Sequence, residues 1–282
     1  MIGAIIGDIV GSRFEWTGNK QKRFALFTPS CRFTDDSLMT IAIAKAFLLH
    51  KGKWKEDCFQ ELVVEKMVKL GKEYAYIHTW GERFYEWFMR DHKPYFSFGN
   101  GAAMRVSPIS WIAESEEDVK YFSKLVTEVS HNHPEGIKGA EAVAMAIYLA
   151  RIGTSKKDIR KRMIGYYPEI ENMTVNGIRP KYGYDEAGEW VTCQGSVPQA
   201  IVCFLDSISF EDAIRNAVSL GADTDTQGCI AGSIAEAFYG IPPEIEEEAM
   251  RFLPEELQGI CYAFSTIKLK RKKKGIANEH IC

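Results

Sequence analysis

The spacing of apolar residues most constrains how this chain can fold, because they recur every three to four positions along much of its length. This period places them on one face of an α-helix. It predicts helices over residues 38–49, 59–70, 122–129, 140–152, 200–205, 213–220 and 230–238. Alternating runs of β-branched residues, which are typical of strands, are almost absent. We therefore expect an all-α protein.

The domain organisation follows from the lack of any linker, low-complexity block or repeat in the 282 residues. We expect a single domain over residues 1–265, built as a compact orthogonal helical bundle with polar loops gathered at one face. Residues 173–192 contain Asn-Gly and further glycines, which predicts either a small hairpin or a long loop. Residues 266–282 are basic, so we expect a flexible, solvated tail, the alternative being an anchor for an acidic surface.

Composition limits the class of protein. The formal net charge is only −3, which does not favour nucleic acid as a partner. No apolar run has the length of a membrane-spanning helix, and the N-terminal segment lacks the basic region of a signal peptide. The seven cysteines include no CxxC pair, as is typical of reduced thiols. We expect a cytoplasmic protein, with a monomer as the default.

Two acidic clusters, far apart in sequence, each precede an apolar stretch of helical period. They are Thr34-Asp35-Asp36 and Asp223-Thr224-Asp225-Thr226. Each alone is consistent with a helix cap. If both helix starts meet, however, four carboxylates converge, and two like charges at about 4 Å repel by roughly 4 kcal/mol at an effective dielectric near 20. Oxygen ligands favour Mg²⁺, Mn²⁺ or Ca²⁺ over zinc, so the pair of clusters predicts a metal centre.

Other glycine-containing segments are candidates for packing or binding. Gly3, Gly7 and Gly11 fall on one helix face, which favours close helix contact, and Glu15 follows in a loop as a base or gate. Gly99 and Gly101 surround Asn100, and such a loop either presents backbone N–H groups to phosphate or forms a plain turn.

Two histidines, His131 and His133, precede a further predicted helix. Zinc would need more His or Cys ligands, and none has suitable spacing. A contact from His131 to an anion or hydroxyl is the favoured interpretation.

Taken together, these segments resemble the ADP-ribosylglycohydrolase family, which includes dinitrogenase-reductase-activating glycohydrolases and ADP-ribosylarginine and ADP-ribosylserine hydrolases. The matches follow the family's order over about residues 2–240. They are GAIIGDIVGSRFEW, FTDDS, FGNGAAMR, SHNHPEGIKGA and GADTDTQGCIAG. Ala222 departs from the pattern, since many members have glycine there. Residues 80–87 and 193–199 look like a bacterial subgroup.

The resemblance implies a binuclear centre of two Mg²⁺ ions, with Mn²⁺ as the alternative. The implied metal ligands are Thr34, Asp35, Asp36, Asp223, Asp225 and Thr226. The implied catalytic carboxylates are Glu15, Asp35 and Asp36. The implied contacts to ADP-ribose come from Gly99, Asn100, Gly101, Met104 and His131.

The activity implied is metal-dependent hydrolysis of the N- or O-glycosidic bond at C1 of the distal ribose, which releases ADP-ribose from an ADP-ribosylated protein or small molecule. The acceptor stays open between arginine, serine, O-acetyl and nucleotide linkages, and ADP-ribosylated nucleic acid is among them. One alternative is a non-catalytic ADP-ribose-binding or crystallin-like protein, although all expected metal positions are filled. The other is a hydrolase of a different nucleotide or phosphate substrate.

Overall fold

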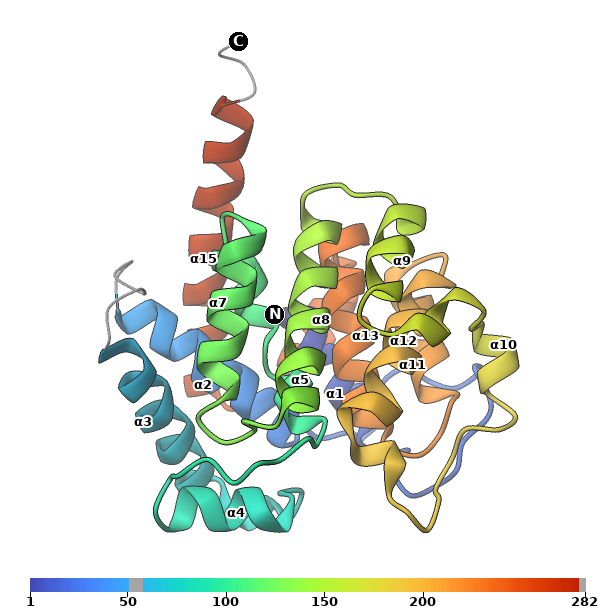
Figure 1. The fold of residues 1–282 in the computed structure, drawn as a ribbon, viewed down its shortest axis with the longest axis horizontal. Coiled ribbons are helices and arrows are strands. Elements are labelled where there is room, and N and C mark those ends of the chain that lie inside the picture. The colour runs from blue at the N-terminus through green and yellow to red at the C-terminus, as the bar shows by residue number, and fades with distance from the viewer. Residues whose placement is uncertain (51–57, 279–282) are drawn as a thin grey trace.

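The computed structural model describes residues 1–50 and 58–278, with side chains up to residue 267. The described chain is helical without a strand, and its one isolated bridge pairs Gly99 with Thr192. The helices are α1 (Ile2–Gly11), α2 (Asp35–Leu49), α3 (Cys58–Glu73), η1 (Ala75–Ile77), α4 (Glu82–Met89), α5 (Gly101–Met104), α6 (Ser107–Ile112), α7 (Glu116–Thr127), α8 (Pro134–Arg151), α9 (Lys156–Ile164), η2 (Pro168–Glu171), α10 (Val175–Ile178), η3 (Glu189–Val191), α11 (Cys193–Leu205), α12 (Phe210–Val218), α13 (Thr224–Tyr239), α14 (Pro243–Met250) and α15 (Glu255–Asn278). The predicted all-α class is confirmed (Figure 1).

Residues 173–192 form a loop that carries α10 and η3, and the hairpin alternative is wrong. Thr174 explains the local turn, because its side chain caps α10 by accepting a hydrogen bond from Gly177 N at 3.1 Å. Farther along the chain, α15 crosses the expected domain boundary at residue 265. The flexible tail stays a prediction, and its last residues, 279–282, lie outside the described chain.

Helices α1 and α13 form the centre of the bundle, and every residue of α1 is buried. The predicted glycine face of α1 is what allows the contact. A Cβ atom built on Gly7 would lie 1.9 Å from the carbonyl oxygen of Gly228, and one built on Gly3 would lie 2.3 Å from that of Gly232. The interpretation of these glycines as packing positions is therefore confirmed.

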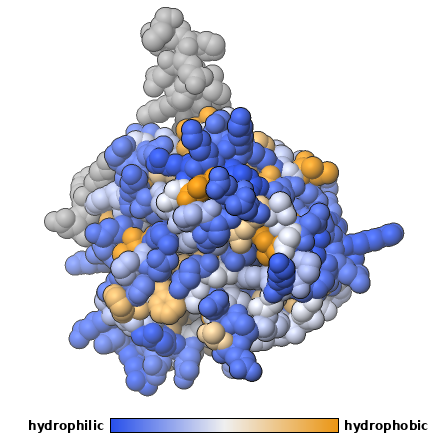
Figure 2. All heavy atoms as spheres, turned by 45° about the vertical axis from the view of Figure 1, so that its right-hand side comes forward, coloured by the Kyte–Doolittle hydropathy of each residue, from blue (hydrophilic) through white to orange (hydrophobic). Residues whose placement is uncertain are grey.

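The remaining helices enclose this central pair. Helices α8, α11 and α12 pack against α13, while α2 contacts α1 and is itself covered by α3 and α15. In Figure 1 the loop after α1 and the loop before α11 run along the same lower edge of the molecule. No described helix is long and apolar enough to cross a membrane. The face seen in Figure 2 is mostly hydrophilic, with hydrophobic side chains in small scattered groups.

Candidate metal centre and active site

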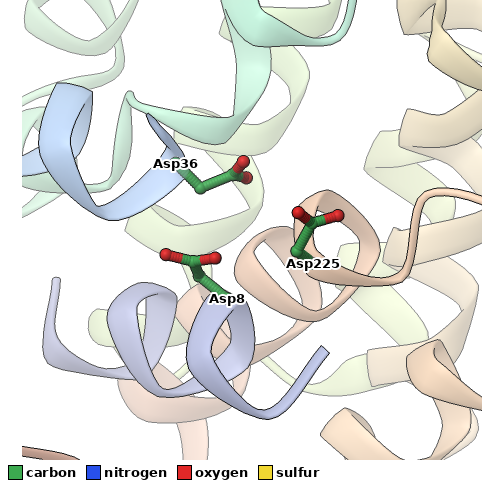
Figure 3. A group of neighbouring side chains, drawn as sticks. All are labelled: Asp8, Asp36 and Asp225. Carbon is green, nitrogen blue, oxygen red and sulfur yellow. The ribbon is translucent and has the colours of Figure 1, made fainter. Parts of the chain in front are cut away.

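Three buried aspartates from three different helices converge beside the central helix pair. Asp8 of α1, Asp36 of α2 and Asp225 of α13 each offer one carboxylate oxygen, and these oxygens all lie within 4.8 Å of one another (Figure 3). Their exposed fractions are 0%, 2% and 4%. The two acidic motifs of the sequence thus meet in the fold, as we expected from Asp36 and Asp225.

Asp8 is the member of this group that sequence reasoning missed. Its carboxylate accepts hydrogen bonds from Thr34 N at 2.9 Å, Thr34 Oγ1 at 2.7 Å, Ser37 N at 3.1 Å and Ser37 Oγ. Asp8 therefore caps the start of α2 from another helix. Burial raises the pKa of Asp8 to about 6, and these hydrogen bonds oppose the rise. An isolated aspartate in the apolar segment IGAIIGDIVG was the available signal.

Asp36 is less well satisfied. Its Oδ2 accepts from Thr34 Oγ1 at 3.3 Å and from Thr226 Oγ1 at 3.4 Å. Its Oδ1 is buried and has no hydrogen-bond partner among the described residues. Burial, followed by the charges of Asp8 and Asp35, raises the pKa of Asp36 well above its usual range. A buried carboxylate oxygen without a donor costs free energy that a cation would offset.

Asp225 and Asp223 flank the start of α13. Burial and the charge of Asp223 raise the pKa of Asp225 well above its usual range. Asp223 Oδ2 accepts a hydrogen bond from Asn100 Nδ2 at 2.7 Å. The Asn100 side chain, which we expected to contact substrate, is thus engaged with a carboxylate of the acidic group.

Asp35 lies next to the three-aspartate group without joining it. Its backbone N donates to Thr79 Oγ1 at 3.2 Å, and its side chain is half-buried. Burial is the main cause that raises the pKa of Asp35 to about 8, and the nearby charge of Asp8 adds to it. All groups assembled here offer oxygen, which fits a hard divalent cation.

Glu15 is half-buried in the turns that follow α1. Burial and the charge of Asp223 raise the pKa of Glu15 to about 7, while Arg32 opposes the rise. These electrostatic neighbours place Glu15 on the same side of the molecule as the acidic group.

An aromatic group lies beside Glu15 and ties its loop to the start of α13. Trp16 stacks on Tyr184 with ring centroids 5.3 Å apart, and Trp190 packs edge-on against both rings. Trp16 N donates to the Tyr184 hydroxyl, which donates to the Ala222 carbonyl at 3.1 Å. Ala222 itself has a φ of +58°, a conformation that favours glycine, which gives a physical reason for the glycine of many family members here.

The glycine loop, residues 99–101, lies against the Asn100–Asp223 contact. Gly99 N donates to Ser97 Oγ at 3.2 Å, and Asn100 N donates to Val191 O at 2.8 Å. Both N–H groups are thus bonded within the chain, so the expected phosphate nest does not have these two donors. Residue 191 is distant in sequence, which is why the loop alone did not reveal this pairing.

His131 and Met104 both lie next to Gly101. His131 is buried, and its Nε2 lies 3.3 Å from the position of a Cβ built on Gly101. Burial and the charge of Arg105 hold the pKa of His131 well below its usual range, so the imidazole is neutral. Met104 is also buried, and its carbonyl accepts from Thr40 Oγ1 at 3.3 Å.

Comparisons with known proteins identify the family and the fold of this chain. The sequence model of the ADP-ribosylglycohydrolase family matches residues 1–268. Mouse ADP-ribosylhydrolase ARH3 is 26% identical, over 94% of this chain and 86% of that protein. An uncharacterised protein of Escherichia coli, YegU, is 24% identical over 86% of each chain. A solved ADP-ribosylglycohydrolase-related protein complex superposes with a TM-score of 0.68 at 21% identity, covering 95% of this chain and 97% of that one, and so shares the fold. The chain belongs to the ADP-ribosylglycohydrolase family.

Proposed function

We propose that this protein is a metal-dependent hydrolase that cleaves the glycosidic bond at C1 of the distal ribose of ADP-ribosylated proteins or small molecules and releases ADP-ribose. The observation that carries the proposal is the convergence of three buried aspartates within 4.8 Å. Membership of the ADP-ribosylglycohydrolase family and similarity to a protein named ADP-ribosylhydrolase support the substrate class.

The hydrogen bonds suggest different roles for the buried carboxylates, one that holds a helix start in place and others that bind metal. Asp8 accepts four hydrogen bonds from Thr34 and Ser37, whereas Asp36 Oδ1 has no partner in the described chain. We therefore assign Asp8 to holding the start of α2 and Asp36 to binding metal. The proposed ligand set is Thr34, Asp35, Asp36, Asp223, Asp225 and Thr226.

Two Mg²⁺ ions, or Mn²⁺ ions in their place, fit an oxygen-only donor set. When bound, divalent cations supply Lewis-acid chemistry and offset the repulsion among the carboxylates. The chain's own part is to hold these carboxylates close together, which the packing of α1 against α13 supports.

Glu15 is the proposed proton acceptor. Its carboxyl group is half-buried, and its pKa is raised to about 7, so it can exchange a proton near neutral pH. Asp35 and Asp36, the other carboxylates considered, are assigned to metal. Glu15 would take the proton of the attacking water as the water oxygen bonds to C1 of the ribose, while the glycosidic bond breaks with positive charge developing at C1 and the departing acceptor takes up a proton. The ADP moiety would extend toward Gly101 and His131.

The test is release of free ADP-ribose from arginine-, serine-, acetyl- and nucleotide-linked substrates with Mg²⁺, Mn²⁺ or EDTA. We expect metal-dependent release from at least one linkage. Asp36→Asn should abolish both release and calorimetric metal binding, because it removes a ligand charge while keeping the side chain's shape. Asp158→Asn, an exposed helix-start position, is the matched control. Full activity of Asp36→Asn would refute the metal assignment, and ADP-ribose binding without any release would favour a non-catalytic protein.

A further inference from the structure

Arg105 is a buried cation behind the glycine loop. It follows α5 directly, and its exposed fraction is 0%. Tyr95 and Cys193 are its electrostatic neighbours, and no carboxylate is among them in the described chain. Its Nε is also buried, without a hydrogen-bond partner among the described residues. Burial lowers the pKa of Arg105 only to about 10, so the guanidinium keeps its charge at neutral pH. A buried charge of this kind needs a structural or functional reason.

The contacts of Ser130 decide where its hydroxyl proton goes. Arg105 Nη2 donates to Ser130 Oγ at 2.8 Å, and Ser130 Oγ lies 2.8 Å from His131 Nδ1. Arginine can only donate. If Nδ1 also donated, the serine proton would need a third partner, and Ser130 Oγ has no other hydrogen-bond partner within the described residues. Leaving that buried proton unpaired is unfavourable, because the hydroxyl loses its bond to water without gaining another. The hydroxyl therefore donates to Nδ1.

This direction fixes the tautomer of His131. With Nδ1 accepting, the neutral ring carries its proton on Nε2. Nε2 faces the glycine loop, 3.3 Å and 3.7 Å from the Cβ positions that side chains at Gly101 and Gly99 would occupy. A side chain at either position would cover it. No acceptor for Nε2 is found in the part of the chain that the structure describes, although His131 is only 4% exposed.

We propose that Arg105 is a positioning residue which, through Ser130, fixes His131 as a neutral Nε2–H donor aimed at an anionic oxygen held over the glycine loop. The proposal rests on the proposed function for the identity of that anion, which would be the diphosphate of ADP-ribose. The charge of Arg105 contributes twice. It orients the serine hydroxyl, and, having no carboxylate partner within the described part of the chain, it favours an anion on the other side of the loop.

The tautomer can be measured directly in the full-length protein by ¹⁵N NMR of the imidazole nitrogens, with His131→Gln used for assignment. We expect a protonated Nε2 and an unprotonated Nδ1 in the wild type. In Ser130→Ala the His131 ring should no longer be held in the Nε2-protonated tautomer alone. Binding of ADP-ribose and of inorganic pyrophosphate should weaken about tenfold, the order of one hydrogen bond to a charged group. Ser130→Thr, which keeps a hydroxyl, should restore both. Ser123→Ala is the control, at a buried serine whose hydroxyl donates to the Lys120 carbonyl of its own helix.

Three results would overturn the proposal. They are a wild-type His131 protonated on Nδ1, a Ser130→Ala variant with unchanged tautomer and affinity, and a wild type that binds neither ADP-ribose nor pyrophosphate. If the protein binds pyrophosphate in a way that depends on Ser130 but does not bind ADP-ribose, the proposed function is refuted while the role of Arg105, Ser130 and His131 is supported.

Discussion

The close contact between α1 and α13 leads to a quantitative prediction about Gly7. Replacing it with alanine adds a Cβ atom 1.9 Å from the Gly228 carbonyl oxygen and 2.7 Å from Cys229 N. Both atoms belong to the backbone of α13, so no side-chain rotation relieves the clash. Helices α1 and α13 must move apart by more than about 1 Å to reach ordinary contact distances near 3.5 Å.

The cost is the balance of two terms. Alanine is favoured over glycine inside a helix by about 1 kcal/mol. Overpacking of a close contact costs about 1–3 kcal/mol, and occasionally more. The higher end applies because Gly3 and Gly11 lie on the same face as Gly7. A Cβ atom built on Gly3 or on Gly11 would likewise lie 2.3 Å or 2.2 Å from a backbone oxygen of α13. Separation at Gly7 therefore loosens the whole interface. We expect a net loss of about 2 kcal/mol in the free energy of unfolding.

The site should respond as well, because Asp8 is the next residue and Asp225 lies on the opposite helix. Calorimetric Mg²⁺ affinity should fall in Gly7→Ala even under conditions where circular dichroism shows a folded protein. Urea denaturation without metal isolates the packing term, and the matched control is Gly259→Ala. Gly259 is an exposed position of α15 where an added Cβ meets nothing within 4 Å, so this variant should gain stability by about 1 kcal/mol and bind metal normally. A Gly7→Ala protein with wild-type stability and metal affinity would refute the argument.

Two further predictions concern charge. The pKa values of Asp8 and Asp35 are raised by burial from 3.8 to about 6 and about 8, so the folded protein binds more protons than the unfolded chain between about pH 4 and 8. Without metal, stability should therefore fall as pH rises through this window, by about 3 kcal/mol for Asp8 alone, and Mg²⁺ should raise the melting temperature more at pH 8 than at pH 5. A metal-free melting temperature that rises from pH 5 to 8 would contradict this sign. Glu15→Gln should lower ADP-ribose release at least about 100-fold with calorimetric metal affinity unchanged, because the base is lost and the ligands stay. Lost metal binding would instead make Glu15 a ligand.

How much of the fold could be predicted depends on how far apart in sequence the interacting residues lie. The apolar period reveals long helices such as α8 and α13, because the buried face of a long helix requires apolar residues at regular spacing in its own sequence. The short α5 spans four residues, which is too short to show an apolar period, and it is held by contacts to distant segments. The pairing of Trp16 with Tyr184 could not be predicted for the same reason, since 168 residues separate them.

The acidic motifs were predictable because each one marks a helix start, where carboxylates are favoured locally. Asp8 was not, because it lies inside α1, where only tertiary structure explains a carboxylate. Its partners are the backbone and hydroxyl groups of Thr34 and Ser37, at the start of another helix. Asn100 shows the converse case. The sequence predicts that its side chain contacts substrate, but in the structure that side chain is bonded to Asp223.

Gly7 and Asp8 together explain how a bundle of helices can hold carboxylates in its interior. The glycine lets α1 and α13 approach until their backbones touch, and this approach sets the spacing between Asp8 and Asp225. The aspartate next to it then accepts from the backbone N–H groups of Thr34, the N-cap of α2, and of Ser37 in its first turn, which fixes where Asp36 lies between them. The carboxylates are thus positioned by helix backbone together with short hydroxyl side chains, those of Thr34 and Ser37 at Asp8 and those of Thr34 and Thr226 at Asp36. Their mutual repulsion works against the same packing, so a metal-free protein is destabilised where a bound cation would stabilise it. Folding stability and metal affinity should therefore change together in variants of this interface and separately in variants of Glu15.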